Sequence, residues 1–187
     1  MRTEIASERA LITGAGSGNG SAITWRLAVL SCHVALVGRT LSSLEQTKKL
    51  CLEQKRGSAA IYQCDLTNEN DICELIAQVG AAGGLDILVN NAGVMVNASL
   101  EKTTTKDFDS IMLTNVRAPF LLMRESLPLL RKSESAEVIN ICSVVAHEGY
   151  PNQSAYTASK HALLGLSKSF AREVYEDGIR VHVIAPG

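Results

Sequence analysis

The sequence predicts an α/β protein in which a doubly wound parallel sheet of about six strands lies between two layers of helices. Apolar runs alternate with amphipathic helical stretches along the whole chain. Nearly all of these runs are apolar on both faces, as strands of a fully covered parallel sheet are. Right-handed crossovers between such strands give a doubly wound, three-layer fold. A length of 187 residues fits a single domain over residues 1–187.

The first half of the chain carries three predicted strands, each followed by a predicted helix. Strands and helices are expected in turn at 10–13, 22–30, 34–37, 41–57, 59–64 and 68–78. Gly38 stops the second strand, and the helix after it is expected to end near Gly57. Asn68 is the predicted N-cap of the third helix. Asp71 takes the acidic position of a capping box, where Glu or Gln is usual.

The second half repeats the alternation with longer helices. Strands and helices are expected in turn at 86–89, 105–132, 137–141, 152–176 and 179–184. Ligands of doubly wound sheets bind beyond the carboxyl ends of the strands. The unusual residues of this chain gather at those ends, so we expect a ligand site there.

Composition and charge exclude several classes of protein. Hydrophobic residues make up 46% of the chain and charged residues 20%, which supports a folded core and argues against disorder. The net charge of −1 leaves no electrostatic footprint for a nucleic acid or an anionic membrane. No apolar stretch reaches the ~20 residues of a membrane span. Residues 1–9 lack the apolar core of a signal peptide.

The cysteines indicate a reducing compartment. The chain has five, an odd number, and none is part of a C-x-x-C pair. His33 lies beside Cys32, but no further ligand completes a metal set. We therefore expect no disulfide framework, no metal site and a cytoplasmic location.

A glycine-rich turn joins the first predicted strand to the first predicted helix. It reads T-G-x-x-x-G-x-G from Thr13 to Gly20. Glycines allow a tight turn and a close approach to a pyrophosphate, and the N-terminus of the following helix favours the anion. The common G-x-G-x-x-G spacing is absent, because its third glycine would fall on Asn19 or Ser21. The segment predicts dinucleotide binding, and a glycine-rich turn without a ligand is the alternative.

Tyr156 and Lys160 form a candidate acid–base pair. Residues i and i+4 share a helix face, so the phenol and the ammonium point into one site. A free tyrosine has a pKa near ~10, and an adjacent ammonium lowers it by stabilising the phenolate. Ser143 ends the preceding strand, where its hydroxyl could bond a substrate oxygen. An ordinary Tyr–Lys helix surface and a turn serine are the alternatives.

Asn115 is an amide in an otherwise apolar stretch of the first long helix. A buried amide needs hydrogen-bond partners. Pro119 has no N–H to donate to the backbone carbonyl of Asn115, which stays free to accept another bond. The pair could hold a water in the site, or it could mark a kink around a satisfied core asparagine.

Together these segments resemble the short-chain dehydrogenase/reductase family, in its subfamily with TGxxxGxG, NNAG and YxxxK motifs. The resemblance covers the whole chain in order and spacing. The matching positions are 13–20, Asp65-Leu66-Thr67, 90–93, Asn115, Ser143, Tyr156, Lys160 and Pro186-Gly187. The family implies a Rossmann-like fold and an NAD(P)-dependent oxidoreductase that interconverts a small-molecule carbonyl and an alcohol by hydride transfer.

The resemblance also implies roles for the matching residues. Tyr156 is the general acid/base, and Ser143 orients the substrate oxygen. Lys160 lowers the tyrosine pKa and binds the nicotinamide ribose, while Asn115 holds a water that relays protons. The predicted cofactor-binding residues are Gly14, Ser17, Gly18, Asn19, Gly20, Arg39, Asp65, Leu66, Asn91, Ala92, Gly93, Tyr156, Lys160, Pro186 and Gly187.

The residues after the second strand predict a preference for NADP(H) over NAD(H). NAD-dependent folds place an Asp or Glu there to bind the 2′-hydroxyl of the adenosine ribose. Residues 37–40 read V-G-R-T, with no carboxylate, and Arg39 offers a fork of donors for a 2′-phosphate. A solvated arginine at the start of a helix is the alternative, with NAD(H) as the second cofactor.

Two features depart from the family pattern. Asn19 stands where the family usually has an apolar residue. The chain ends at Gly187, whereas family members continue with a segment that covers the substrate and adds a last strand. We therefore expect a C-terminally truncated chain with the strand 179–184 at a sheet edge. An inactive NADP-binding fragment is the alternative function.

The two long helices predict a homodimer or homotetramer. They carry more apolar residues than one sheet face needs. We expect that five leucines of the first long helix cannot all face inward. They are Leu121, Leu122, Leu127, Leu129 and Leu130. Family members pair these helices across a twofold axis, and symmetric dimers are the commonest oligomers. Burial against the protein's own loops is the alternative.

Overall fold

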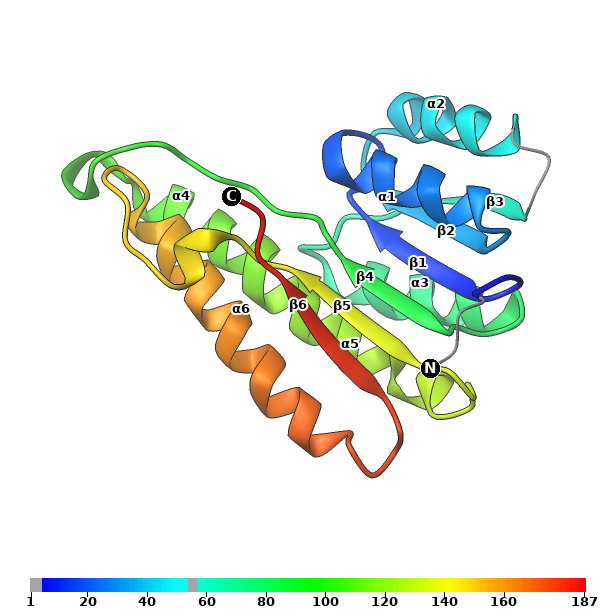
Figure 1. Cartoon of the computed structure of the whole chain (residues 1–187). Helices are drawn as coiled ribbons and strands as arrows, with labels where there is room; N and C mark the ends of the chain where they lie inside the picture. The colour runs from blue at the N-terminus through cyan, green and yellow to red at the C-terminus, as the bar shows by residue number, and fades with distance from the viewer. Residues whose placement is uncertain (1–4, 54–56) are drawn as a thin grey trace.

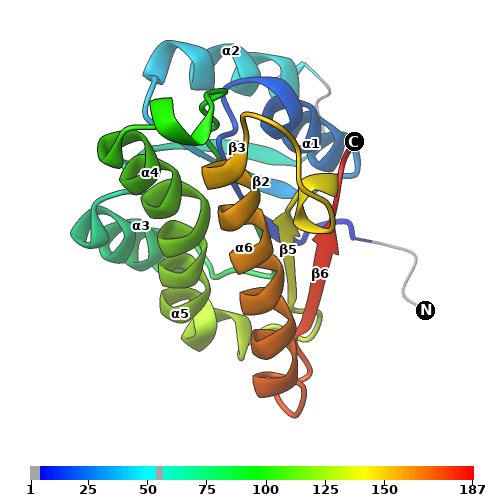
Figure 2. The ribbon, with the colours of Figure 1, turned by 90° about the vertical axis from the view of Figure 1, so that its left-hand side faces the viewer.

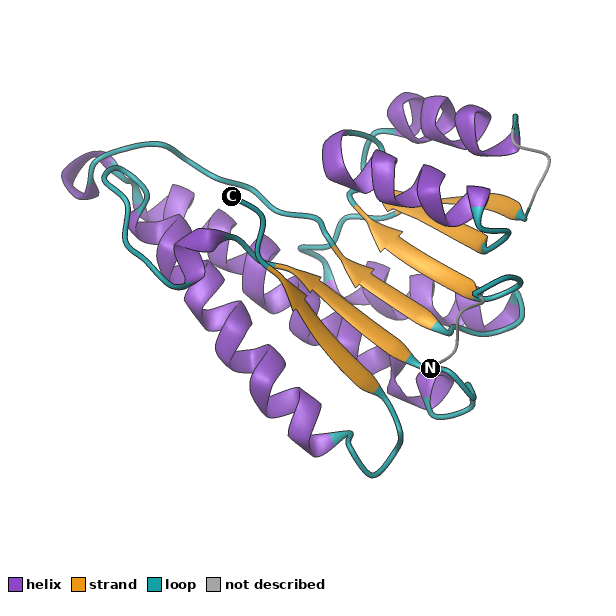
Figure 3. Ribbon diagram, viewed as in Figure 1, coloured by secondary structure: helices purple, strands orange, loops and turns teal. Residues whose placement is uncertain are grey.

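The computed structural model, which describes residues 5–53 and 57–187, confirms the predicted fold class. Six parallel strands form one sheet in the order β3-β2-β1-β4-β5-β6. Helices lie on both faces of this sheet (Figures 1 and 3). The strand order reverses between β1 and β4, which is the point where doubly wound sheets bind ligands.

The elements follow the predicted order. The strands are β1 (Arg9–Thr13), β2 (His33–Gly38), β3 (Ser58–Gln63), β4 (Ile87–Asn90), β5 (Glu137–Ile141) and β6 (Arg180–Ile184). The α-helices are α1 (Gly18–Val29), α2 (Leu41–Leu52), α3 (Glu69–Ala81), α4 (Thr105–Met112), α5 (Ala118–Leu130) and α6 (Ser154–Glu173). Shorter helical turns are η1 (Leu100–Lys102), η2 (Leu113–Arg117) and η3 (Val144–Ala146). The helix expected to end near Gly57 ends at Leu52, and residues 54–56 lie outside the described part.

Two apolar clusters, one on each face of the sheet, form the core. α1 and α2 cover one face, and α3, α5 and α6 cover the other, as the view in Figure 2 shows. Leu11 and Ile12 are neighbours on β1 but belong to different clusters. Side chains alternate across a strand, so a continuous apolar run supplies both faces.

The helix predicted at 105–132 is interrupted where Asn115 lies. Between α4 and α5, η2 is a π-helical turn, and the backbone N–H of Ala118 donates to the carbonyl of Leu113, five residues back. Pro119 lies in the first turn of α5. π-turns are rare and are frequent at functional sites. Here the turn carries the predicted site asparagine.

The start of α3 corrects one prediction. Asn68 caps the helix, and its side-chain oxygen accepts from the N–H of Asn70 at 3.0 Å. Asp71 forms no capping box with Asn68, because its carboxylate accepts from the N–H of Asp65 at 3.2 Å. The loop after β3 folds over the first turn of α3 and presents this N–H to it. Asp71 therefore shapes the loop before the helix.

The leucines of α5 differ from expectation, because all of them contact the protein's own core. Three are buried and two are partly buried against the same cluster, in the order Leu121, Leu122, Leu130, Leu127 and Leu129. α5 contacts α3 as well as β4 and β5, so it has more than one inward face. The large apolar side chains exposed nearby are instead Phe108, Leu113 and Phe120.

β6 lies at an edge, as predicted; Val181 packs against the core and Ile184 is half exposed. Among the helices of the described residues, none combines the length and the apolar character that a membrane crossing needs. All five cysteines are free thiols.

Candidate active site

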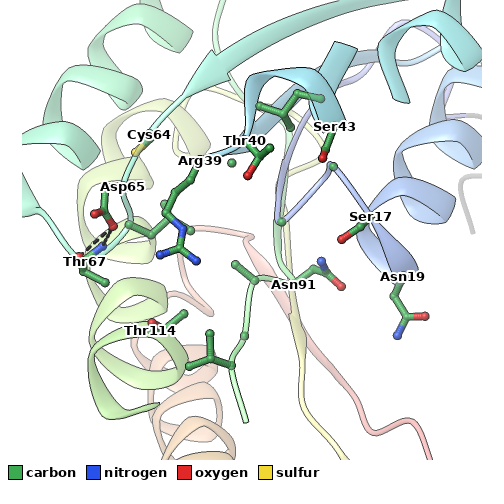
Figure 4. A pocket seen from close by; sticks show the side chains of 18 residues that line it. Ser17, Asn19, Arg39, Thr40, Ser43, Cys64, Asp65, Thr67, Asn91 and Thr114 are labelled. Atoms are coloured by element: carbon green, nitrogen blue, oxygen red, sulfur yellow. Dashed lines mark hydrogen bonds between the residues drawn. The ribbon is translucent and has the colours of Figure 1, made fainter. Parts of the chain in front are cut away.

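Two adjoining cavities lie at the carboxyl ends of the strands. Their volumes are about 410 Å³ and about 220 Å³, and both are lined by Asn19, Asn91, Gly93 and Val94. Figure 4 shows the larger cavity, into which the side chain of Arg39 extends. The shared wall makes the two cavities one groove across the point where the strand order reverses.

Most predicted cofactor-binding residues line this groove. The larger cavity is lined by the predicted Gly14, Ser17, Asn19, Arg39, Asp65, Leu66, Asn91, Ala92 and Gly93. The smaller cavity adds the predicted Ser143, Tyr156, Lys160 and Pro186. Gly18 and Gly187 are exposed outside these walls, and Gly20 and Asn115 are buried behind them.

Close backbone contacts shape the glycine-rich turn. Gly14 has a φ of +65°, a conformation that favours glycine. A Cβ on Gly20 would lie 2.1 Å from the carbonyl oxygen of Gly14 and 2.6 Å from Nδ2 of Asn91. A Cβ on Gly16 would lie 2.9 Å from the Cβ of Ser43. Gly20 therefore packs α1 against the backbone of the turn at Gly14, outside the residues that line the two cavities, and its part in cofactor binding stays a prediction.

Thr13 and Asn91 hold the ends of β1 and β4 together. Thr13 Oγ1 donates to the carbonyl of Val89 at 3.3 Å. The same oxygen accepts from the backbone N–H groups of Asn91 and Ala92 at 2.9 and 3.0 Å. Asn91 Nδ2 donates back to the carbonyl of Thr13 at 2.9 Å. These bonds keep the shared wall of the two cavities rigid.

Arg39 and Asp65 lie in the larger cavity, away from the smaller one. Thr67 donates to Asp65 Oδ1 through its backbone N–H at 3.0 Å and its hydroxyl at 2.8 Å. These bonds, and to a smaller degree the Arg39 guanidinium, hold the pKa of the Asp65 carboxyl below its usual value. This part of the groove therefore combines a fixed carboxylate with a cation.

Asn115 is fully buried, and its side-chain amide is satisfied. Oδ1 accepts from the backbone N–H of Val94 at 2.8 Å, and Nδ2 donates to the carbonyl of Val94 at 2.9 Å. Nδ2 also donates to Ser159 Oγ at 3.0 Å, and Ser159 donates to the carbonyl of Tyr156 at 2.7 Å. Asn115 thus joins η2, the loop after β4 and α6. The free backbone carbonyl expected from Pro119 stays a prediction.

Ser143, Tyr156 and Lys160 meet in the smaller cavity. Ser143 follows β5 and caps η3, while one face of α6 carries the other two. Lys160 Nζ is buried, donates to the carbonyl of Ile141 at 2.8 Å and lies 5.7 Å from the centre of the Tyr156 ring. A hydroxyl, a phenol and an amine therefore share one small polar space.

The pKa of Tyr156 differs from expectation. Burial raises it above its ordinary value, and the hydrogen bond with Ser143 offsets this in part. Burial also lowers the pKa of Lys160. The ammonium is directed at the carbonyl of Ile141, and burial is the largest influence on the pKa of the phenol. The predicted lowering of the tyrosine pKa by Lys160 is therefore not found in this structure.

A family model described as "short chain dehydrogenase" matches residues 8–187. The chain belongs to this family. Among curated relatives, a 3-oxoacyl-[acyl-carrier-protein] reductase of Rickettsia bellii is 37% identical over 184 residues, which are 98% of this chain and 73% of that protein. A 2-(R)-hydroxypropyl-CoM dehydrogenase of Xanthobacter autotrophicus is 35% identical over 97% of this chain and 74% of its own length.

Solved short-chain dehydrogenases have the same fold. A metagenomic short-chain oxidoreductase in complex with NADP superposes with a TM-score of 0.92 at 32% identity, over 98% of this chain and 83% of its own. A dehydrogenase/reductase from Sinorhizobium meliloti 1021 gives 0.92 at 38% identity, over 98% and 73%. Sequence and fold together thus make the protein a short-chain oxidoreductase.

The residues of this short-chain dehydrogenase fit such a dinucleotide. Ser17 and Asn19 place the N-terminus of α1 in the wall of the larger cavity, where the backbone N–H groups of a helix N-terminus suit a pyrophosphate. Arg39 supplies a cation in the larger cavity. Tyr156 and Lys160 supply the polar groups of the smaller cavity, where the nicotinamide half would lie.

Several wall residues were not predicted from the sequence. The larger cavity also includes Thr40, Ser43 and Thr114, and the smaller includes Met95 and Cys142. Thr114 and Cys142 are direct neighbours of predicted residues, so adjacency was an available signal. Ser43 had no such signal, because it reaches the cavity only through the packing of α2 against the glycine-rich turn.

Proposed function

We propose that this short-chain dehydrogenase interconverts a carbonyl and an alcohol with NADP(H) as the preferred cofactor and Tyr156 as the general acid/base. The observation that carries the proposal is the continuous groove with Arg39 in its larger part and Ser143, Tyr156 and Lys160 in its smaller part. A hydroxyl, a phenol and an amine suit the handling of one substrate oxygen and its proton.

The side chains of the smaller cavity divide the proton chemistry between them. A nicotinamide bound beside Tyr156 and Lys160 would supply the hydride for the carbonyl carbon in reduction and would accept one from the alcohol carbon in oxidation. Ser143 holds the substrate oxygen, and Tyr156 donates the phenolic proton to it. We assign to Lys160, whose Nζ lies 5.7 Å from the centre of the Tyr156 ring, the stabilisation of the resulting phenolate, and Asn115 holds Val94 in the cavity wall. Protonation of the phenolate from solvent completes the cycle.

The function is tested by mixing purified protein with NADPH or NADH and a panel of small carbonyl compounds. We expect NADPH oxidation with at least one of them, at a lower KM for NADPH than for NADH. Absence of NADP(H) binding in a direct titration would reject the proposal. Binding without turnover across the panel would favour the inactive-fragment alternative.

Substitution of Arg39 tests the cofactor preference. Residues 38–40, which lie at the carboxyl end of β2 and line the larger cavity, include no carboxylate. Arg39→Asp would remove the fork of donors for the 2′-phosphate and add an acceptor for the 2′-hydroxyl. We expect NADPH affinity to fall about tenfold or more and NADH affinity to rise. Arg26 is exposed on α1 and lies outside the groove. Arg26→Asp makes the same charge change there and should leave the cofactor preference unchanged.

Measurement of NADH and NADPH binding by the parent protein would also test this prediction. If it bound NADH as tightly as NADPH, the assignment of Arg39 would be wrong. An unchanged cofactor preference in Arg39→Asp would have the same meaning.

We propose that two copies of the chain pair through the helices α4, α5 and α6. An apolar groove between them is lined by Met112, Leu113, Val116, Phe120 and Leu166, with Asp109 and Arg117 at its rim. Covering such a groove with a second copy buries apolar surface that water now contacts.

Sedimentation tests this assembly. We expect a dimer or a tetramer at micromolar concentration and a shift toward monomer in Phe120→Glu, which places a charge in the groove. Leu50→Glu is the matched control, since Leu50 is similarly exposed but lies on α2. A monomeric parent protein would contradict the proposal.

A further inference from the structure

We propose that Arg117, which is neither a catalytic residue nor a wall of the cofactor groove, is a positioning residue that holds the Asp65–Thr67 loop in shape for the adenosine half of the cofactor. The inference rests on the proposed NADP(H) binding. It begins from the loop itself. Asp65, Leu66 and Thr67 line the larger cavity, although they belong to neither a strand nor a helix.

Several hydrogen bonds within residues 65–71 shape the loop, among them one from the N–H of Asn68 to the carbonyl of Asp65 at 3.0 Å. Thr67 donates twice to Asp65 Oδ1, and Asp71 accepts from the N–H of Asp65. The carbonyl of Thr67 takes part in none of these bonds and is bonded from another part of the chain.

Arg117 supplies that contact from the end of η2. Its Nη1 donates to the carbonyl of Thr67 at 3.3 Å, and its Nη2 pairs with Glu69 Oε2 at 2.6 Å. One planar guanidinium therefore bonds to both the loop and the first turn of α3. A guanidinium presents several donors in a fixed planar arrangement, whereas an ammonium carries its donors on one atom.

The turn that carries Arg117 is held rigidly in the structure. Asn115 lies two residues before Arg117 in the same π-turn, is fully buried and is tied to Val94 and Ser159 by three hydrogen bonds. Arg117 thus connects the loop to the segment that also holds the wall of the smaller cavity. Movement of the loop would require breaking the Arg117 contacts or shifting the turn that buried Asn115 holds in place.

Arg124 provides a matched control for this arrangement. It pairs with the other oxygen of Glu69 at 2.7 Å and with Glu125 at 2.6 Å, and its guanidinium lies 5.6 Å from the centre of the Phe120 ring. The side chains of Arg117 and Arg124 are comparably exposed, at 40% and 45%. Exposed ion pairs alone contribute little. The two arginines differ in that Arg117 donates to the loop carbonyl.

The first test measures binding of adenosine 2′,5′-bisphosphate, which reports on the adenosine half without turnover. We expect Arg117→Ala to weaken binding about three- to tenfold, as loss of a charge-assisted hydrogen bond does, and Arg124→Ala to change it less than twofold. With a carbonyl substrate, the KM for NADPH should rise by the same factor while kcat at saturating cofactor stays within twofold. Arg117→Met, which keeps the apolar stem, should behave as Arg117→Ala does.

The second test needs no cofactor. Hydrogen exchange of the Thr67 amide should be severalfold faster in Arg117→Ala than in the parent protein and unchanged in Arg124→Ala. Equal effects of the two variants would assign the result to Glu69 and overturn the proposal, as would unchanged exchange and binding in Arg117→Ala. Sedimentation shows whether assembly is intact, and loss of binding only on dissociation would also overturn it. Failure of the parent protein to bind any nucleotide would instead reject the proposed function.

Discussion

Tyr156→Phe is expected to lower turnover by about 10²–10⁴-fold while NADP(H) affinity stays nearly unchanged. The substitution removes only the phenolic oxygen, and the ring that packs beside Lys160 is kept. Proton transfer to the substrate oxygen is then left to water. Steady-state kinetics and a direct titration of NADP(H) separate the two effects.

The control for this prediction is Tyr175→Phe. Tyr175 is 76% exposed and follows α6, outside both cavities, so its loss of a hydroxyl should leave turnover unchanged. A Tyr156→Phe enzyme that turns over at the parent rate would show that another group transfers the proton. A Tyr156→Phe enzyme that loses NADP(H) binding as well would show a structural role.

Gly20→Ala is expected to destabilise the protein by about 3 kcal/mol and to abolish cofactor binding. The added methyl would lie 2.1 Å from the carbonyl oxygen of Gly14, and backbone in a tight turn cannot yield as a flexible side chain can. α1 would have to move away from β1, which would displace the helix N-terminus that we propose binds the pyrophosphate. Urea unfolding and NADP(H) titration measure the two losses.

Gly165→Ala is the matched control, because Gly165 lies in α6 with no atom within 4 Å of an added Cβ. A helical glycine with free space gains about 0.5–1 kcal/mol from this change. Parent-like stability and affinity in Gly20→Ala would contradict the packing role assigned to Gly20.

The local sequence patterns were sufficient for the architecture. Alternating apolar runs and amphipathic stretches predicted the six strands and the main helices, because side-chain periodicity and burial are linked directly. The joint pattern of the glycine-rich turn, Ser143, Tyr156 and Lys160 also predicted the groove, since strand ends of a parallel sheet gather at one edge. The predicted capping box was wrong because the carboxylate of Asp71 accepts a hydrogen bond from the N–H of Asp65, which lies outside the helix.

The sequence by itself therefore determined the fold class, the strand positions and the residue types at the site. The tertiary structure alone decided that Gly20 packs against Gly14, that Asn115 bonds Val94 and Ser159, and that Arg117 reaches Thr67. It also decided the raised pKa of Tyr156, which depends on the burial of the phenol. These features join segments far apart along the chain, or depend on what surrounds a side chain. Neither is encoded in local periodicity, because distance and solvent access are fixed only when the elements pack.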